Sequence, residues 1–282
     1  GHQVTATTTR ADKRRVLQDL GAEAVVMDGL DAASVAEAVA AARPEAIAHQ
    51  MTSIGDPDMR HMDRWFAATN RLRTEGTDHL LAAAAAVGVS HVVAQSYAGW
   101  IGLRDGGWVK TEDDPLDPLT GTSARPMIEA LHHVEKAVVE AGGAALRYGW
   151  LYGPGATDSQ LELVRKRQFP LIGNGAGHTS WVHLDDAASA TVLAVEQAAT
   201  GVYNIVDDEP APAEQWLPYL AECAGAKRPL RIPAWLARLL AGEMPVLIMT
   251  QGRGFSNAKA KRELGWELRY PSWRQGFATG LT

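Results

Sequence analysis

The amino-acid sequence predicts an α/β protein built on a doubly wound parallel sheet, and three observations indicate this fold class. Short strands alternate with helical segments over the first half of the chain. An apolar strand runs into the polar and aromatic segment LRYGWLYGPG (146–155), and WVHLDDAASA (181–190) then opens another helix. Ligands of open α/β sheets bind at the carboxyl ends of strands, so we expect the 146–155 segment to line a pocket.

The predicted strands and helices follow one another in alternation. Each strand is a short run of apolar or β-branched residues; the strands are 4–9, 24–27, 46–49, 92–95 and 144–146. Each helix has apolar residues at helical spacing or is rich in alanine; the helices are 11–20, 32–42, 59–87 and 127–141. Beyond residue 186 we expect a helix at 187–197, a strand at 202–206 and helices around Trp216 and Trp235. The alternation favours parallel strands joined by helical crossovers.

Composition excludes several classes of function. The 282 residues carry a net charge of −6 and the basic cluster at 165–167 is short, so we expect no nucleic-acid partner. The single cysteine, Cys223, excludes an internal disulfide and a cysteine-based zinc site. No histidine and carboxylate spacing predicts a metal site, and the hydrolase motif Gly-x-Ser-x-Gly is absent. Without a long apolar run or a signal-peptide pattern, we expect a soluble cytoplasmic protein with no membrane partner.

Five sequence blocks occur in the same order and at similar spacing as those of a known family. They are TEGTDHLLAAAAAVGVSHVV (74–93), QSYAGW (95–100), LRYGWLYGPG, WVHLDD (181–186) and NAKAKRELGW (257–266). Over essentially its whole length the chain resembles the extended short-chain dehydrogenase/reductase family, the NAD-dependent epimerase/dehydratase-like proteins.

The resemblance implies a division into two parts. Residues 1–155 would form a Rossmann-type dinucleotide-binding core. Residues 156–282 would form mostly a C-terminal substrate-binding lobe, with sheet elements near 181–206 returning to the core. The resemblance also implies a small-molecule substrate, and a homodimer through the helices around 65–87 and 127–141 would be typical of the family.

The first departure from the family concerns phosphate binding. Family members begin with a strand and a Gly-rich turn whose backbone amides hold the dinucleotide pyrophosphate. Here GHQVTATTTR (1–10) resembles the family's second strand, so that unit is missing. Either the sequence is truncated, or the phosphate cradle is lost, or a segment of another chain fills the gap. Truncation is favoured, because losing the first strand would leave backbone groups unpaired inside a parallel sheet. If the turn is truly absent, no cofactor is expected.

The residues that would hold a cofactor follow from the resemblance. Arg10, at the end of the second-strand segment, can pair with a 2′-phosphate, so NADP is favoured and NAD is the alternative. Arg10 is equally well explained as an exposed residue that opens the 11–20 helix. By analogy with the family, the remaining cofactor contacts are Asp28 near the adenine, Gln50, Met51 and Thr52 along the middle of the cofactor, and Tyr148 near the nicotinamide.

The second departure concerns the reaction centre. The family uses a Ser or Thr with a Tyr and a Lys four residues later on one helix face; the Tyr transfers the proton and the Lys lowers its pKa. Ser96 matches the serine position and would polarise a carbonyl, so Ser96→Ala is expected to lower turnover by at least ~10²-fold. The Tyr and Lys positions fall on Met127 and Leu131, which supply no proton.

Three other residues are candidates for the proton donor, besides water. Tyr97 carries a phenol next to Ser96, but adjacent strand residues point to opposite faces of a sheet. His132 can act as acid or base near neutral pH, although a helix with one buried and one exposed histidine explains His132 and His133 more simply. Tyr148 follows the strand end, and its alternative role is an ordinary pocket wall.

The expected substrate site is aromatic. Trp100, Trp150 and Trp181 lie in or beside the family blocks, and three indoles predict a flat apolar substrate better than a sugar diphosphate. The alternative is that some of the three belong to the core. The other residues expected to contact substrate are Met127, His178, Arg253 and Asn257.

These features together lead to one functional hypothesis and two alternatives. The hypothesis is an NADP-dependent oxidoreductase or isomerase acting on a small apolar or aromatic carbonyl or alcohol. The first alternative is a family member that has abandoned redox chemistry and uses the same cleft for cyclisation, dehydration or isomerisation. The second is a non-catalytic cofactor sensor. Because a fold does not determine function, the site has to decide between them.

Overall fold

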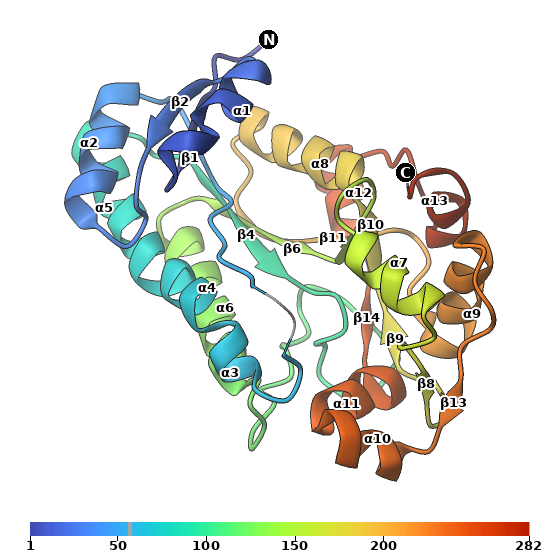
Figure 1. Cartoon of the computed structure of the whole chain (residues 1–282). Coiled ribbons are helices and arrows are strands. Elements are labelled where there is room, and N and C mark those ends of the chain that lie inside the picture. The colour runs from blue at the N-terminus through green and yellow to red at the C-terminus, as the bar shows by residue number, and fades with distance from the viewer. Residues whose placement is uncertain (56–57, 282) are drawn as a thin grey trace.

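A computed structural model describes residues 1–55 and 58–281 and confirms the predicted α/β fold class (Figure 1). Four parallel strands form the central sheet, in the order β11-β6-β4-β3. They are β3 Ile47–His49, β4 Val92–Tyr97, β6 Ala144–Tyr148 and β11 Gly201–Ile205. β4 and β6 occupy the middle of the sheet, and most of their side chains are buried.

The first two strands form a separate sheet. β1 (Thr5–Thr8) pairs in parallel with β2 (Glu23–Val26), and within the described residues neither strand pairs with the central sheet. The connection consists of a 3-10 turn, Ala11–Lys13, and α1 (Arg14–Asp19), which buries no residue. The predicted strands and helix are confirmed.

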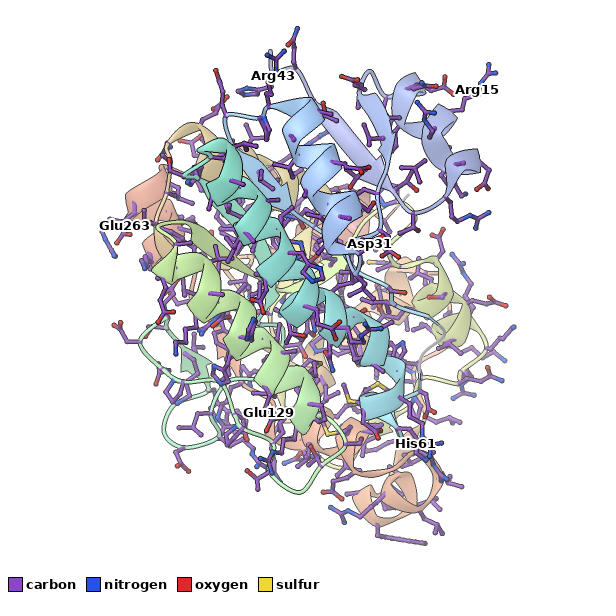
Figure 2. The ribbon with its side chains drawn as sticks, turned by 90° about the vertical axis from the view of Figure 1, so that its left-hand side faces the viewer. Arg15, Asp31, Arg43, His61, Glu129 and Glu263 are labelled. Atoms are coloured by element: carbon purple, nitrogen blue, oxygen red, sulfur yellow. The ribbon has the colours of Figure 1, made fainter. Side chains whose placement is uncertain are left out.

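Helices cover both faces of the central sheet. Figure 2 shows α2 (Ala32–Ala42), α5 (Thr77–Val87) and α6 (Arg125–Glu140) side by side over one face. On the other face lie α8 (Leu184–Glu196) and α12 (Ala258–Leu264). α2 has the predicted bounds because both ends are encoded locally: Asp31 caps its first amides, and Arg43 takes a left-handed conformation before Pro44.

The long helical region predicted over 59–87 is confirmed from Met62 to Val87, but it is not a single regular helix. Two short helices, α3 (Met62–Trp65) and α4 (Ala67–Arg71), lead into a π-helical turn over Leu72–Gly76, and α5 follows. Short π-helical turns are rare and occur often at functional sites. The turn buries Arg73, a residue that apolar periodicity alone would place at the surface.

The C-terminal part is organised around an aromatic core. β7 (Trp150–Tyr152) pairs in parallel with β10 (Trp181–His183), and α9 (Ala213–Cys223) and α13 (Trp273–Thr279) pack against this region. The remaining helices are α7 Asp158–Arg165, α10 Ala234–Ala241 and α11 Glu243–Gln251. The remaining strands are β5 Val109–Lys110, β8 Leu171–Ile172, β9 His178–Thr179, β12 Ala211–Pro212, β13 Arg231–Ile232 and β14 Gly254–Phe255. The division of the chain near residue 155 stays a prediction.

Candidate active site

The carboxyl ends of β3, β4 and β6 lie together at one edge of the central sheet. Tyr97 and Tyr148 are register partners at the ends of β4 and β6, and β3 ends at His49, the register partner of Ala94. This edge is where doubly wound sheets bind ligands. In the described part of the chain, two surface depressions of about 380 and 530 Å³ lie elsewhere, beside Trp266 and Tyr219. The candidate site is therefore defined by the side chains at the strand ends.

Ser96 is predicted to polarise a substrate carbonyl, but its hydroxyl is buried and already hydrogen-bonded. The side chain is 0% exposed, and its hydroxyl donates to Glu135 Oε1 at 2.6 Å. Arg147 also donates to Glu135, through Nε at 2.7 Å and Nη2 at 2.8 Å. This buried network attaches α6 to β4 and β6. Ser96 is thus a structural residue whose hydroxyl already has a partner.

The two tyrosine candidates differ in how tightly they are held. Gln50 Nε2 donates to the Tyr148 hydroxyl at 3.1 Å, and that hydroxyl lies 2.6 Å from Thr191 Oγ1. Because Thr191 donates its own proton to a backbone carbonyl, Tyr148 is the donor between them. Burial raises the pKa of both Tyr97 and Tyr148 above the ordinary value. Tyr97 packs at the partly buried rim of an apolar cluster, next to Trp100.

The positions of the family's Tyr and Lys are apolar in space as well as in sequence. Met127 is 2% exposed and Leu131 is 0% exposed, and both belong to the apolar cluster that also holds Trp100 and Ile248. His132, the remaining candidate on α6, is exposed to solvent and does not point into this cluster. Its predicted catalytic role is therefore not supported. α6 brings no proton donor to the strand ends.

The three tryptophans divide between rim and core. Trp181 is 0% exposed and sits in the aromatic core with Trp216 and Phe277, so its predicted contact with substrate is wrong. Trp150 stacks on Trp181 at 5.4 Å and is only partly buried. It packs against both the aromatic core and the Met127 cluster. Trp100 is 6% exposed within the latter cluster. Trp150 is the indole best placed to meet a ligand.

A second aromatic group involves a tryptophan that the sequence analysis did not single out. Trp108, which is 41% exposed, stacks on His178 at 4.9 Å, and the Arg253 guanidinium lies 4.0 Å from the centre of its ring. Arg253 donates to the carbonyls of Gln251 and Arg104, which ties together two loops. Burial and the nearby Arg253 charge lower the pKa of His178.

Asn257 has a structural role rather than the predicted contact with substrate. Its side-chain amide donates to Val206 O at 2.8 Å and to Asp208 Oδ1 at 2.7 Å. Both bonds hold the start of α12 against the end of β11. The side chain is 7% exposed, so the amide has little surface left for a ligand.

The predicted cofactor residues lie along the strand ends. Asp28 is exposed after β2, where its carboxylate accepts from Leu30 N. The next residue, Gly29, touches the Met51 side chain closely enough that a Cβ atom there would collide with it. The loops after β2 and β3 are therefore in contact, and Gln50 and Thr52 are exposed on the second of them.

Two positive groups near these loops suit a phosphorylated dinucleotide. Arg10 is exposed at the end of β1, where it pairs with Asp12. Arg73 is buried beside the ends of β3 and β4, and its Nη1 has no hydrogen-bond partner in the described chain. An orphaned buried donor of this kind is what a bound phosphate would satisfy. The residues present thus fit a nicotinamide dinucleotide.

Comparison with known proteins decides the family. The sequence profile described as the NAD dependent epimerase/dehydratase family matches residues 1–206, most of the chain. The chain belongs to this family. Its membership confirms the resemblance in the sequence blocks, and it makes the protein an enzyme of the extended short-chain dehydrogenase/reductase type.

Relatives within the epimerase/dehydratase family have different activities. A 3-diazoavenalumate denitrifying reductase of a Streptomyces species is 43% identical over 98% of this chain and 91% of its own length. A dTDP-glucose 4,6-dehydratase of Streptomyces griseus is 29% identical over 59% of this chain and 54% of its own. The more similar of these two relatives is thus a reductase.

Solved structures of the family share the fold. UDP-glucose 4-epimerase of Thermotoga maritima, with UDP-glucose, has a TM-score of 0.75 at 19% identity and covers 99% of this chain and 97% of its own. A human epimerase family protein with NADPH has a TM-score of 0.73 at 15% identity, with 98% of each chain covered. In the described part of this chain, no helix has the length and apolarity needed to span a membrane. The same residues include no cluster of three or more His, Cys, Asp or Glu suited to a metal ion.

Proposed function

We propose that this protein is an NADPH-dependent reductase that replaces the diazonium group of an aromatic carboxylate by hydrogen. The name of the 43% identical relative denotes a diazo carboxylate as substrate and a reductive loss of nitrogen. The observation that carries the proposal is in this chain: the positions of the family's proton-donating Tyr and of its Lys hold Met127 and Leu131, both buried in an apolar cluster.

The proposed reaction accounts for these two residues because it needs no proton. The bound cofactor supplies a hydride. The carbon–nitrogen bond breaks and N₂ leaves with its electron pair, while the hydride pair forms the new carbon–hydrogen bond. An aryl diazonium cation and NADPH therefore yield an arene, N₂ and NADP⁺, with charge balanced. Reduction of a carbonyl, in contrast, requires a proton at oxygen, which is the task of the family's tyrosine.

The side chains at the strand ends suit a flat and reactive substrate. Trp150 and Tyr97 present partly exposed aromatic surface at the rim of the apolar cluster. These surfaces would orient an aromatic ring against the cofactor. The Met127 cluster would keep water away from the diazonium carbon, where water competes with hydride. The cofactor-binding role falls to Arg10, Asp28 and the 50–52 loop.

The test is an assay of the purified protein with NADPH and a carboxylated benzenediazonium salt. We expect protein-dependent oxidation of NADPH with one N₂ released per NADPH. Deuterium carried at the reactive position of NADPH should appear on the aromatic carbon, measured by mass spectrometry. Reactions without protein correct for spontaneous reduction. Reduction of aromatic aldehydes or ketones at a higher rate than the diazonium salt would contradict the proposal.

Substitution of Trp150 tests whether its partly exposed indole contacts the substrate. Trp150→Ala should raise KM for the diazonium substrate by about tenfold, because a stacking surface is lost. Trp235→Ala is the control, since Trp235 lies on α10 and is 66% exposed. Equal kinetics of the two variants would show that Trp150 does not contact the substrate.

A further inference from the structure

Arg73 is a buried guanidinium without a partner. It is 5% exposed, and among residues 1–55 and 58–281 no side chain or carbonyl forms a hydrogen bond or ion pair with it. Burial lowers the pKa of Arg73 to about 10, so the group stays charged at neutral pH. A buried charge that is not compensated is costly to a folded protein. An anionic ligand would compensate this buried charge.

Arg147 shows how this protein normally treats a buried arginine. It is also 5% exposed, but Glu135 receives two hydrogen bonds from it, at 2.7 and 2.8 Å. Within residues 1–55 and 58–281, no carboxylate pairs with Arg73 in this way, and the nearby Glu75 is bound to Arg71 at the surface. Nη1 lacks a hydrogen-bond partner in both arginines, but the charge of Arg147 is compensated by the Glu135 carboxylate, whereas the described residues place no carboxylate on Arg73.

Three described groups around Arg73 carry no negative charge. From β4, Tyr97 faces it with a phenol whose pKa is raised by burial. From β3, His49 is neutral, because burial lowers its pKa to about 4. The Phe66 ring lies 5.8 Å from the guanidinium carbon. The Arg73 charge therefore lies in an apolar and uncharged setting, where an oxyanion would be bound strongly.

The location points to the cofactor. Arg73 lies on the π-helical turn, and its charge acts on His49 at the end of β3 and on Tyr97 at the end of β4. Gly76, at the end of the same turn, lies close to the Met51 side chain in the 50–52 loop. A dinucleotide crossing the carboxyl edge of the sheet places its pyrophosphate between the adenine end, near β2, and the nicotinamide end, near β4. A guanidinium at this point can form two parallel bonds to one phosphate group.

We propose that Arg73 binds the nicotinamide-side phosphate of the dinucleotide. The inference rests on the proposed use of a nicotinamide cofactor. It assigns a phosphate contact to a side chain of the π-helical turn, in addition to any contact made by backbone amides. A carboxylate of the substrate is the other oxyanion that could reach this edge, and the experiment separates the two.

The experiment compares Arg73→Met with wild type and with Arg71→Met. Arg71 is two residues away, exposed and paired with Glu75, so it serves as the matched control. NADPH binding is titrated by calorimetry. Arg73→Met should raise Kd by about 10- to 100-fold, as expected for lost charge-assisted bonds to phosphate, and Arg71→Met should not. Without cofactor, Arg73→Met should melt at the same temperature as wild type or higher, because an unpaired buried charge is gone.

Fragments of the cofactor locate the contact. Reduced nicotinamide mononucleotide carries one phosphate and dihydronicotinamide riboside carries none. Arg73→Met should weaken binding of the first and leave binding of the second unchanged. If Arg73→Met does not fold, Arg73→Lys keeps the charge, loses the two-bond geometry and should raise Kd for NADPH about three- to tenfold.

The outcomes are distinct. Failure of the wild-type protein to bind NADPH or NADH overturns the proposed function as well as this inference. Normal wild-type binding with an unchanged Kd in Arg73→Met overturns only the inference. A variant that loses binding of the aromatic carboxylate while it keeps NADPH also overturns it, and assigns Arg73 to the substrate.

Discussion

At the strand ends, the face of the sheet to which each side chain points determines whether that side chain can contact a ligand. Ser96 and Arg147 are register partners, and both extend to Glu135 on α6. Tyr148, the residue after Arg147, extends to Thr191 on α8, on the other face of the sheet. A residue can be matched to a family position from sequence, but neighbouring residues of a strand point to opposite faces of the sheet. A match that is displaced by one residue therefore assigns the side chain to the wrong face. Ser96 illustrates this, because its hydroxyl is enclosed.

Substitution of Ser96 separates a structural from a catalytic role. Ser96→Ala should lower the free energy of unfolding by about 1 to 2 kcal/mol, because a buried hydrogen bond to Glu135 is lost. The value of kcat should stay within about threefold of wild type, whereas loss of a donor to the transition state typically costs 10²-fold or more. Urea unfolding and steady-state kinetics measure the two effects. A 100-fold loss of kcat with unchanged stability would return Ser96 to the reaction centre.

Arg10 is the residue that we predict to discriminate between the two nicotinamide cofactors. Its side chain is exposed at the end of β1, where it pairs with Asp12 at the surface and can exchange partners. Arg10→Ala should raise Kd for NADPH by about tenfold and leave Kd for NADH unchanged, because only NADPH has a 2′-phosphate. Arg15→Ala is the control, since Arg15 points away from the body of the protein (Figure 2). Equal effects on both cofactors would contradict this role.

At the scale of elements, buried polar contacts attach the helices to the sheet. His49, at the end of β3, lies 3.1 Å from Thr77 Oγ1 on α5 and accepts from Met51 N. Glu135 on α6 holds Arg147 and Ser96 in the same way. Apolar patterning predicted the helices, but these polar contacts determine where each helix packs on the sheet.

His49 makes stability depend on pH. Burial lowers its pKa from 6.5 to about 4, so the folded state keeps it neutral where the unfolded state binds a proton. Its contribution is therefore fully present above pH 6.5 and is lost as the pH falls toward 4, by about 3 kcal/mol in total. The free energy of unfolding of wild type and His49→Gln, measured across this range, isolates the effect. Parallel pH profiles would contradict it.

The comparison with His49→Gln is needed because another buried group acts in the opposite direction. Burial raises the pKa of Asp207 well above 3.8, so its folded form holds a proton that the unfolded form releases. Its contribution to stability grows as the pH falls and is lost as the pH rises through the folded pKa. The total pH profile therefore combines both groups, whereas the difference between the two proteins reports His49.

The long helical segment shows where local patterning stops being sufficient. Residues 59–87 have helical composition throughout, yet the structure divides them at Phe66 and inserts the π-helical turn at Leu72–Gly76. In contrast, α2 matches its predicted bounds because local residues define both termini: Asp31 caps its start, and Arg43–Pro44 stop it. The π-helical turn packs against α6, which follows about 50 residues later in the chain, and no local pattern records that contact.

At the scale of the whole molecule, the β1–β2 pair and the central sheet differ in burial. Every residue of β6 is buried, whereas no residue of β1 is fully buried. Two-stranded sheets have little stability of their own. The β1–β2 unit therefore depends on its surroundings, including any ligand at its carboxyl edge.

Hydrogen exchange tests this difference directly. Amides of β1 and β2 should exchange at least about tenfold faster than those of β4 and β6, because local opening needs less free energy where few contacts are buried. Saturation with NADPH should slow exchange in β1 and β2, whose carboxyl edge would hold the adenine end. Mass spectrometry of peptides from each strand gives the rates. Uniform exchange, or protection restricted to the C-terminal part, would contradict the prediction.

The sequence by itself determined the α/β class, the order of the strands along the chain, the family and the absence of the usual Tyr and Lys. These follow from local periodicity and from blocks of residues, which are properties of the chain in one dimension. The tertiary structure alone decided that Ser96 and Trp181 are enclosed and that Trp150 is only partly buried. It also decided that Arg73 is buried with its Nη1 unpaired among the residues that the structure describes. Burial and pairing depend on residues distant in sequence, and only folding brings those together.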